Sequence, residues 1–100
     1  MVKHIVFFRL TSCRSEAEKE QQLGRMKEIF SVLPSKLPYI VNYTTARNIS
    51  SEGHAWDFII DSLFSSDDDL KRYIISPEHT EAVKAASAIG KEKAVIDYEF

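Results

Sequence analysis

The chain has 100 residues, which suits a single domain, because chains usually divide only beyond roughly 250 residues. Hydrophobic residues make up 44% of the chain and charged residues 28%, the balance of a globular protein with a buried core. Thirteen basic residues against fifteen acidic ones leave a net charge of -2 and no basic cluster, which argues against nucleic acid as a partner.

The cysteine content and the N-terminus exclude several further classes. Cys13 is the only cysteine, so an internal disulfide and a cysteine-pair zinc site are excluded, and a reducing compartment is favoured. Lys3 and Arg9 interrupt the apolar N-terminal run, which is too short for a signal peptide, and no stretch is long enough to span a membrane. We therefore expect a cytoplasmic protein without a membrane partner.

The first two predicted elements are a strand and a helix. Residues 2–10 are rich in β-branched and aromatic types that alternate between two faces, which predicts a strand. The sequence SEAE forms a capping box with Ser15 as N-cap and Glu18 at the third helical position. Apolar residues at helical spacing follow, so we expect a helix over residues 16–33 that ends before Pro34.

Two further strands follow, over residues 39–48 and 55–64, with the turn sequence SSEGH between them. They are expected to pair as a hairpin. In the second of these strands, Trp56, Phe58 and Phe64 stand at even-numbered positions and so lie on one face, which we assign to the core. His54 lies in the polar turn and is expected to be solvated.

The C-terminal part is predicted as two short helices and a strand. Ser66 and the three aspartates after it cap a helix that runs to about residue 75. Ser76 caps the next helix with Pro77 in its first position, and Gly90 fits that helix's C-terminal turn. The sequence KAVIDYEF then predicts the closing strand.

The element order β-α-β-β-α-β predicts an α+β fold of the ferredoxin-like type, with a four-stranded antiparallel sheet and helices on one face. The other sheet face would be left bare. By strand alternation this face carries the side chains of Ile5, Phe7, Ile59 and Leu63. These side chains are too apolar to face water, so we expect this face to pack against a second copy of the chain.

This order, together with the sequences VKHIVFFRL, ARNIS, WDFIIDSLF, YIISPEH and VIDYEF, resembles the stress-responsive dimeric α/β-barrel (Dabb) family. The match covers nearly the whole chain, as one domain over residues 1–100. It implies a homodimer in which two four-stranded sheets close into a dimeric α+β barrel with the helices outside.

Most members of this family have no established activity, so the first implication is a protein of uncharacterised activity with an apolar small-molecule pocket between sheet and helices. A cofactor-independent cyclase or lyase is the alternative, and for it the resemblance implies a site. A characterised plant polyketide cyclase of the family performs an intramolecular aldol condensation without metal or organic cofactor. Its tyrosine–histidine pair corresponds to Tyr73 and His79, and a first-strand pocket histidine corresponds to His4. Further pocket positions fall on Leu23 and Met26 in the first helix and on Phe58 and Ile60 in the third strand. Phe58 stands where that cyclase has a histidine.

The residues themselves leave two interpretations of Tyr73 and His79 open. With Ser76 as N-cap, His79 occupies the first helical turn, where the helix dipole favours a neutral imidazole that can accept a proton. A neighbouring tyrosine could hold a developing oxyanion, and the substrate would be a small, largely apolar carbonyl or phenolic compound. In the alternative, Tyr73 packs in the core with its hydroxyl bonded and His79 only stabilises the helix start.

Other site chemistries receive less support from the sequence. The histidines lack metal-ligand spacing, and a site of three histidines with Asp57 would need unrelated elements to converge, so we expect no obligatory metal. The dimeric barrel is also similar to that of small monooxygenases and haem-degrading enzymes, which makes a monooxygenase-like activity a lower alternative.

Overall fold

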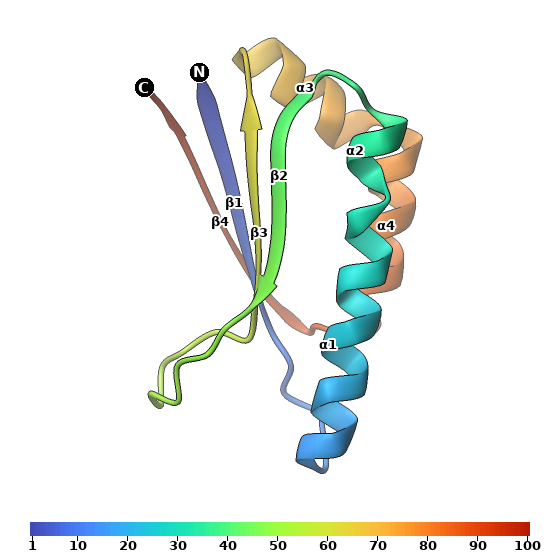
Figure 1. Cartoon of the computed structure of the whole chain (residues 1–100), viewed down its shortest axis with the longest axis vertical. Helices are drawn as coiled ribbons and strands as arrows, with labels where there is room; N and C mark the ends of the chain where they lie inside the picture. Colours follow the sequence, from blue (N-terminus) through green and yellow to red (C-terminus); the bar gives the residue numbers. More distant parts are fainter.

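Four strands form one antiparallel sheet in the order β2-β3-β1-β4, and all helices lie on one of its faces (Figure 1). The computed structural model describes residues 1–100. The strands are β1 (Val2–Arg9), β2 (Ile40–Arg47), β3 (Phe58–Phe64) and β4 (Glu92–Glu99). The helices are α1 (Glu16–Ser31), α2 (Leu33–Lys36), α3 (Asp67–Ile75) and α4 (Pro77–Ser87). The predicted ferredoxin-like fold is thereby confirmed.

The three predicted helix starts are present with their serine caps. The side-chain oxygens of Ser15, Ser66 and Ser76 each accept a hydrogen bond from the backbone N–H three residues later. The first predicted helix, however, is divided. It ends at Ser31, and Pro34 lies in the first turn of α2, where a missing N–H costs nothing.

The core lies between the sheet and the helices and contains 17 buried hydrophobic residues. Met26 and Phe30 of α1 pack against the inward-facing side chains of β1, among them Phe8. Gly90 closes the C-terminal turn of α4 as expected, since its backbone N–H donates to the Ala86 carbonyl at 2.8 Å, and it does so without a positive φ. A side chain there would meet Phe8, with its Cβ atom only 2.9 Å from Phe8 Cδ1.

The other sheet face carries no helix. The side chains of Ile5, Phe7, Ile59 and Leu63 are only partly buried there. Ile96 and Tyr98 of β4 lie on the same face and are 53% and 47% exposed. No helix of the chain combines the length and the apolar character that crossing a membrane requires.

The assignment of Trp56 to the core is wrong. Strand β3 begins only at Phe58, so Trp56 lies before the strand and the alternation of side chains along β3 does not predict which face it occupies. Its ring lies 6.4 Å from that of Phe7, centroid to centroid, and the Arg9 guanidinium lies 4.2 Å from the indole centroid. Trp56 therefore extends the helix-free face.

Candidate functional site

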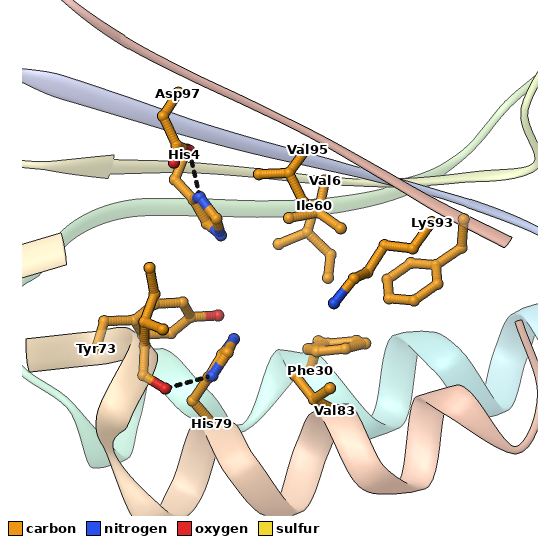
Figure 2. A pocket seen from close by; sticks show the side chains of 12 residues that line it. His4, Val6, Phe30, Ile60, Tyr73, His79, Val83, Lys93, Val95 and Asp97 are labelled. Atoms are coloured by element: carbon orange, nitrogen blue, oxygen red, sulfur yellow. Dashed lines mark hydrogen bonds and ion pairs between the residues drawn. The ribbon is translucent and has the colours of Figure 1, made fainter. Parts of the chain in front are cut away.

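A cavity of about 190 Å³ lies between the sheet and helices α3 and α4 (Figure 2). Apolar side chains form most of its wall, including Val6, Phe30, Ile60, Val83 and Val95. Its polar lining consists of His4, Tyr73, His79, Lys93 and Asp97. The three strands β1, β3 and β4 thus supply one side of the cavity, and the helices supply the other.

The joint between α3 and α4 brings Tyr73 and His79 together. The Ser76 hydroxyl donates to the Tyr73 carbonyl at 2.7 Å and accepts from the His79 backbone N–H at 3.2 Å. One serine therefore ends one helix and starts the next. The rings of Tyr73 and His79 lie with centroids 4.5 Å apart and planes inclined at 55°.

Hydrogen bonding fixes which nitrogen of His79 faces the cavity. The Nδ1 atom lies 3.0 Å from the Ile74 carbonyl oxygen, which only accepts, so Nδ1 carries the proton. In the neutral ring Nε2 then keeps its lone pair, and it points into the cavity (Figure 2). Burial lowers the pKa of His79, and the nearby His4 and Lys93 lower it further, while the Ile74 contact opposes them. His79 is therefore neutral at pH 7.

The hydroxyl of Tyr73 is hydrogen-bonded and also faces the cavity. Tyr73 is 1% exposed, and its oxygen lies 2.9 Å from the hydroxyl oxygen of Tyr43 on β2. Burial raises the pKa of Tyr73 to about 12, whereas the hydrogen bond from Tyr43 lowers it. Because Tyr43 can donate to Tyr73, the Tyr73 proton is free to be donated into the cavity (Figure 2).

The third polar group is a histidine–carboxylate pair across two strands. His4 of β1 lies opposite Asp97 of β4, and its Nδ1 atom is 2.5 Å from Asp97 Oδ1. A carboxylate accepts, so the His4 Nδ1 is protonated and its other nitrogen is directed toward the cavity (Figure 2). The edge of the His4 ring approaches Tyr73 at 6.0 Å between centroids.

Four of the residues predicted from the sequence meet in this cavity, namely His4, Ile60, Tyr73 and His79. Leu23, Met26 and Phe58 do not line it. Leu23 and Met26 are 4% and 0% exposed, because their face of α1 is closed against the sheet. Phe58 is 2% exposed, two positions along β3 from Ile60, and lies outside the cavity wall.

Sequence reasoning missed Tyr43, Lys93 and Asp97. Lys93, Val95 and Asp97 alternate along β4 and share the helix-covered face with their β1 partners. That alternation was readable in the sequence KAVID, although the register that places Asp97 against His4 was not. Tyr43 was hidden by a register shift in β2 between Ile40 and Asn42.

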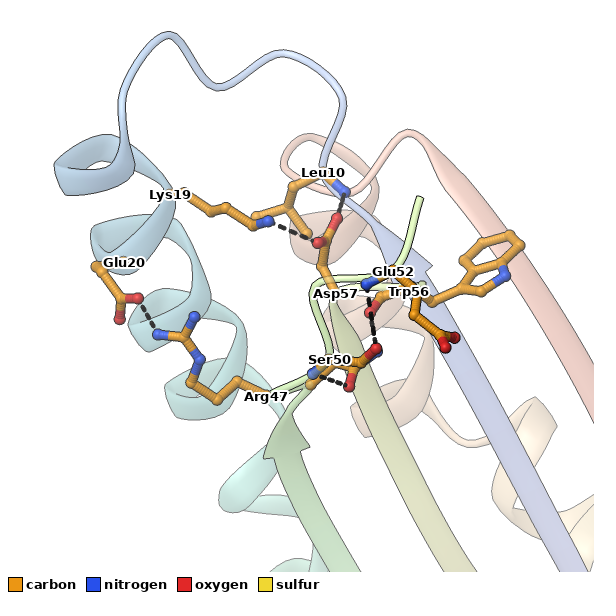
Figure 3. Close-up of polar contacts among 9 residues, drawn as sticks. Leu10, Lys19, Glu20, Arg47, Ser50, Glu52, Trp56 and Asp57 are labelled. Atoms are coloured by element: carbon orange, nitrogen blue, oxygen red, sulfur yellow. Dashed lines mark hydrogen bonds and ion pairs between the residues drawn. The ribbon is translucent and has the colours of Figure 1, made fainter. Parts of the chain in front are cut away.

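Polar residues outside the cavity have structural roles. The Asp57 carboxylate accepts from the Leu10 backbone N–H at 2.8 Å and pairs with Lys19 Nζ at 2.8 Å, which joins β1 to α1 (Figure 3). The side chain of His54 is 89% exposed, as expected. No group of three or more histidine, cysteine, aspartate or glutamate side chains is arranged to hold a metal ion.

Comparisons with known proteins agree with this architecture. A family model described as the stress responsive A/B barrel domain, Dabb, matches residues 2–100. An uncharacterised protein of Streptomyces coelicolor is 33% identical over 103 residues, covering 100% of both chains.

Solved structures with this fold include proteins of unknown function and an enzyme. A dimeric protein of unknown function with a ferredoxin-like fold from Bacteroides fragilis is 34% identical, with a TM-score of 0.85, covering 99% of this chain and 95% of the other. A hydroxynitrile lyase from Passiflora edulis is 21% identical, with a TM-score of 0.79 and coverage of 97% and 90%, which shows a shared fold.

Proposed function

The chain belongs to the stress responsive A/B barrel (Dabb) family, and we propose that it binds a small, largely apolar carbonyl or phenolic compound in the cavity beside His79 and transfers a proton on it without a cofactor. One observation carries this proposal. The free nitrogen of His79 and the hydroxyl of Tyr73 face the same apolar cavity, with ring centroids 4.5 Å apart.

The protonation states of the pair suit enolate chemistry. A neutral His79 accepts the proton of a carbon next to a carbonyl group, so the C–H bond breaks and an N–H bond forms at Nε2. The electron pair moves onto the carbonyl oxygen. Tyr73, protonated because burial raises its pKa to about 12, donates a hydrogen bond to that oxygen. An aldol-type cyclase or lyase needs these steps.

The remaining lining supports a small ligand with one polar end. His4, held by Asp97, presents its second ring nitrogen, which can form a hydrogen bond that orients a ligand hydroxyl group. The cavity of about 190 Å³ is smaller than the roughly 300–1,000 Å³ of sites for drug-sized ligands. This volume favours a single ring or a short branched chain over the tetrapyrrole of a haem-degrading enzyme.

We further propose that two copies pair through the helix-free sheet face as an α+β barrel. Support comes from the contiguous apolar side chains of Ile5, Phe7 and Ile59, which no element of the chain covers. The related Bacteroides fragilis protein is described as dimeric. In such a pair both cavities stay on the outer, helix-covered side of their own sheets.

Solvent-deuterium exchange tests the chemistry without knowledge of the natural substrate. Acetophenone in D₂O with the protein should lose its methyl protons faster than in buffer alone, as measured by proton NMR. Tyr73→Phe should slow this exchange by roughly 10²-fold, because it removes the oxyanion donor. Circular dichroism and thermal unfolding of each variant establish that it is folded.

The variant His79→Asn separates the two interpretations of His79. Asparagine keeps an amide N–H that can donate to the Ile74 carbonyl, but it removes the proton acceptor in the cavity. Exchange should fall to the buffer rate, while the matched variant His54→Asn should exchange as the wild type does. Unchanged exchange in folded His79→Asn would leave His79 with a structural role only. Binding of acetophenone without exchange would contradict turnover, and absence of binding at millimolar concentration would contradict the whole proposal.

A further inference from the structure

A lysine side chain occupies the end of the cavity that lies away from the His4–Asp97 pair. Lys93 and Asp97 lie on the same face of β4, four residues apart, which corresponds to about 13 Å along a strand. The Lys93 amine is directed into the cavity, between the strand side and the helix side (Figure 2). The cavity is therefore polar at both ends and apolar between them.

The charge of Lys93 has no partner in the chain. Arg9 pairs with Glu92 at 3.0 Å and Lys3 pairs with Asp61 at 2.8 Å. Lys93, like Lys91, has no carboxylate within 4.0 Å of its amine, but of these two lysines only Lys93 lines the cavity. The one carboxylate in the cavity lining, Asp97, is held by His4. Lys93 is close enough to His79 to lower its pKa. An unpaired cation beside an apolar wall is a binding group for an anion.

We propose that Lys93 binds a carboxylate of the ligand, so that the natural ligand is a small keto acid or phenolic acid whose apolar body lies between the two polar ends. This inference rests on the proposed function, because it assumes that the carbonyl or phenol group lies beside His79 and Tyr73. A carboxylate fits better than a phosphate, since a phosphate dianion usually takes several cationic or backbone donors and Lys93 is the single cation in the lining.

The ligand then has a fixed direction in the cavity. With its carboxylate at Lys93, its carbonyl oxygen reaches toward Tyr73 and the adjacent carbon toward His79. The apolar body contacts Phe30 and Val83 on the helix side. A neutral ketone of the same shape keeps the apolar contacts but loses the charge pairing, so acid and neutral analogues should differ in affinity.

Matched pairs of acids and amides measure this difference. The probes are 4-acetylbenzoate against 4-acetylbenzamide, and levulinate against levulinamide, with binding followed by NMR titration. Lys93 is exposed to solvent, which screens its charge, so wild-type protein should bind each acid about two- to fivefold more tightly than its amide. In Lys93→Met the ratio should fall to about one, and in Lys93→Arg it should persist.

The control variant is Lys91→Met, which removes the same charge two residues earlier, outside the cavity lining. It should keep the wild-type preference, because a nonspecific effect of net charge would affect both lysines alike. Equal affinity of wild-type protein for acid and amide, or an acid preference that survives Lys93→Met, would overturn the role of Lys93 and leave the proposed function intact. Failure of all four probes to bind would contradict both.

Discussion

His4 and Asp97 stand 93 residues apart in the chain, yet their side chains meet at 2.5 Å between Nδ1 and Oδ1. The contact follows from the antiparallel register of β1 and β4, which sets the two residues directly opposite each other. The side chain of His4 is 6% exposed, while that of Asp97 is 41% exposed. The partly exposed carboxylate of Asp97, at the rim of the cavity, therefore accepts the hydrogen bond that the buried His4 N–H needs.

Replacement of Asp97 tests the structural value of this contact. Asp97→Ala leaves the His4 N–H buried without a partner, so we expect the free energy of unfolding to fall by about 1–3 kcal/mol. Asp97→Asn retains an amide oxygen that can accept the same hydrogen bond and should cost less. Urea denaturation measures both. Equal losses in the two variants would show that the N–H of His4 does not depend on this acceptor.

The lowered pKa of His79 gives the protein a pH dependence of known sign. Below its ordinary pKa of 6.5 the unfolded chain binds a proton at His79 more readily than the folded chain does. Stability is therefore highest above pH 6.5 and decreases as the pH falls from there through the folded-state pKa. Proton abstraction also needs the neutral ring, but it depends on the folded-state pKa alone and should decrease only as the pH approaches that lower value.

Thermal unfolding between pH 5 and pH 7 measures this dependence. We expect the melting temperature of His79→Asn to depend less on pH than that of the wild type, because the variant has no titrating group at this position. His54→Asn is the matched control, because it replaces a histidine whose side chain is 89% exposed and lies outside the cavity lining. A wild-type slope in His79→Asn would assign the pH dependence to other groups.

Tyr43 is expected to act through Tyr73. Its hydroxyl lies 2.9 Å from that of Tyr73, and its hydrogen bond lowers the pKa of Tyr73, which makes Tyr73 a better donor. Tyr43→Phe should slow acetophenone exchange by roughly tenfold, less than the loss of a direct oxyanion donor, and change acetophenone affinity little. An equal loss in affinity and exchange rate would indicate that the variant disturbs the cavity itself.

The predictable part of this structure is the part that local chemistry determines. Ser76 could be recognised as a helix cap in the sequence, and the cap is what aligns Tyr73 with His79. Strand alternation likewise assigned His4 to the helix-covered face.

The unpredicted part depends on register and helix rotation. Ile40 and Tyr43 both face the helices, although they differ in parity, because the shift between Ile40 and Asn42 adds a residue to the strand. Leu23 and Met26 are apolar positions of α1 as expected, but the rotation of the helix closes that face against the sheet. The register shift has no signature in the order of residue types, and the apolar spacing of α1 predicts a buried face without distinguishing core from cavity wall.

Two glycines should respond to alanine in opposite directions. In Gly90→Ala the new Cβ atom would lie 2.9 Å from Phe8 Cδ1 and 3.2 Å from Phe8 Cβ, so the core must shift, and we expect a loss of about 1–3 kcal/mol. In Gly24→Ala, within α1, nothing lies within 4 Å of the new atom, and alanine should stabilise the helix by about 0.5–1 kcal/mol. Urea denaturation of both variants measures the two changes in the free energy of unfolding. A Gly90→Ala variant as stable as wild type would mean that Phe8 can move without cost.

The helix-free sheet face is the last feature with a direct test. Wild-type protein should elute with twice the mass of the 11.5 kDa chain in size-exclusion chromatography with light scattering. Ile59→Asp places a charge among apolar neighbours such as Phe7, its partner across β1 and β3, and should yield a monomer at micromolar concentration.

The matched control for this face is Ile75→Asp, at the end of α3, where the side chain is 79% exposed and lies away from the sheet. It introduces the same charge and should remain dimeric. A monomeric mass for wild-type protein would contradict pairing through this face. A dimer that survives Ile59→Asp would place the contact elsewhere, and Ile96 and Tyr98 of β4, both about half exposed, would be the next positions to substitute.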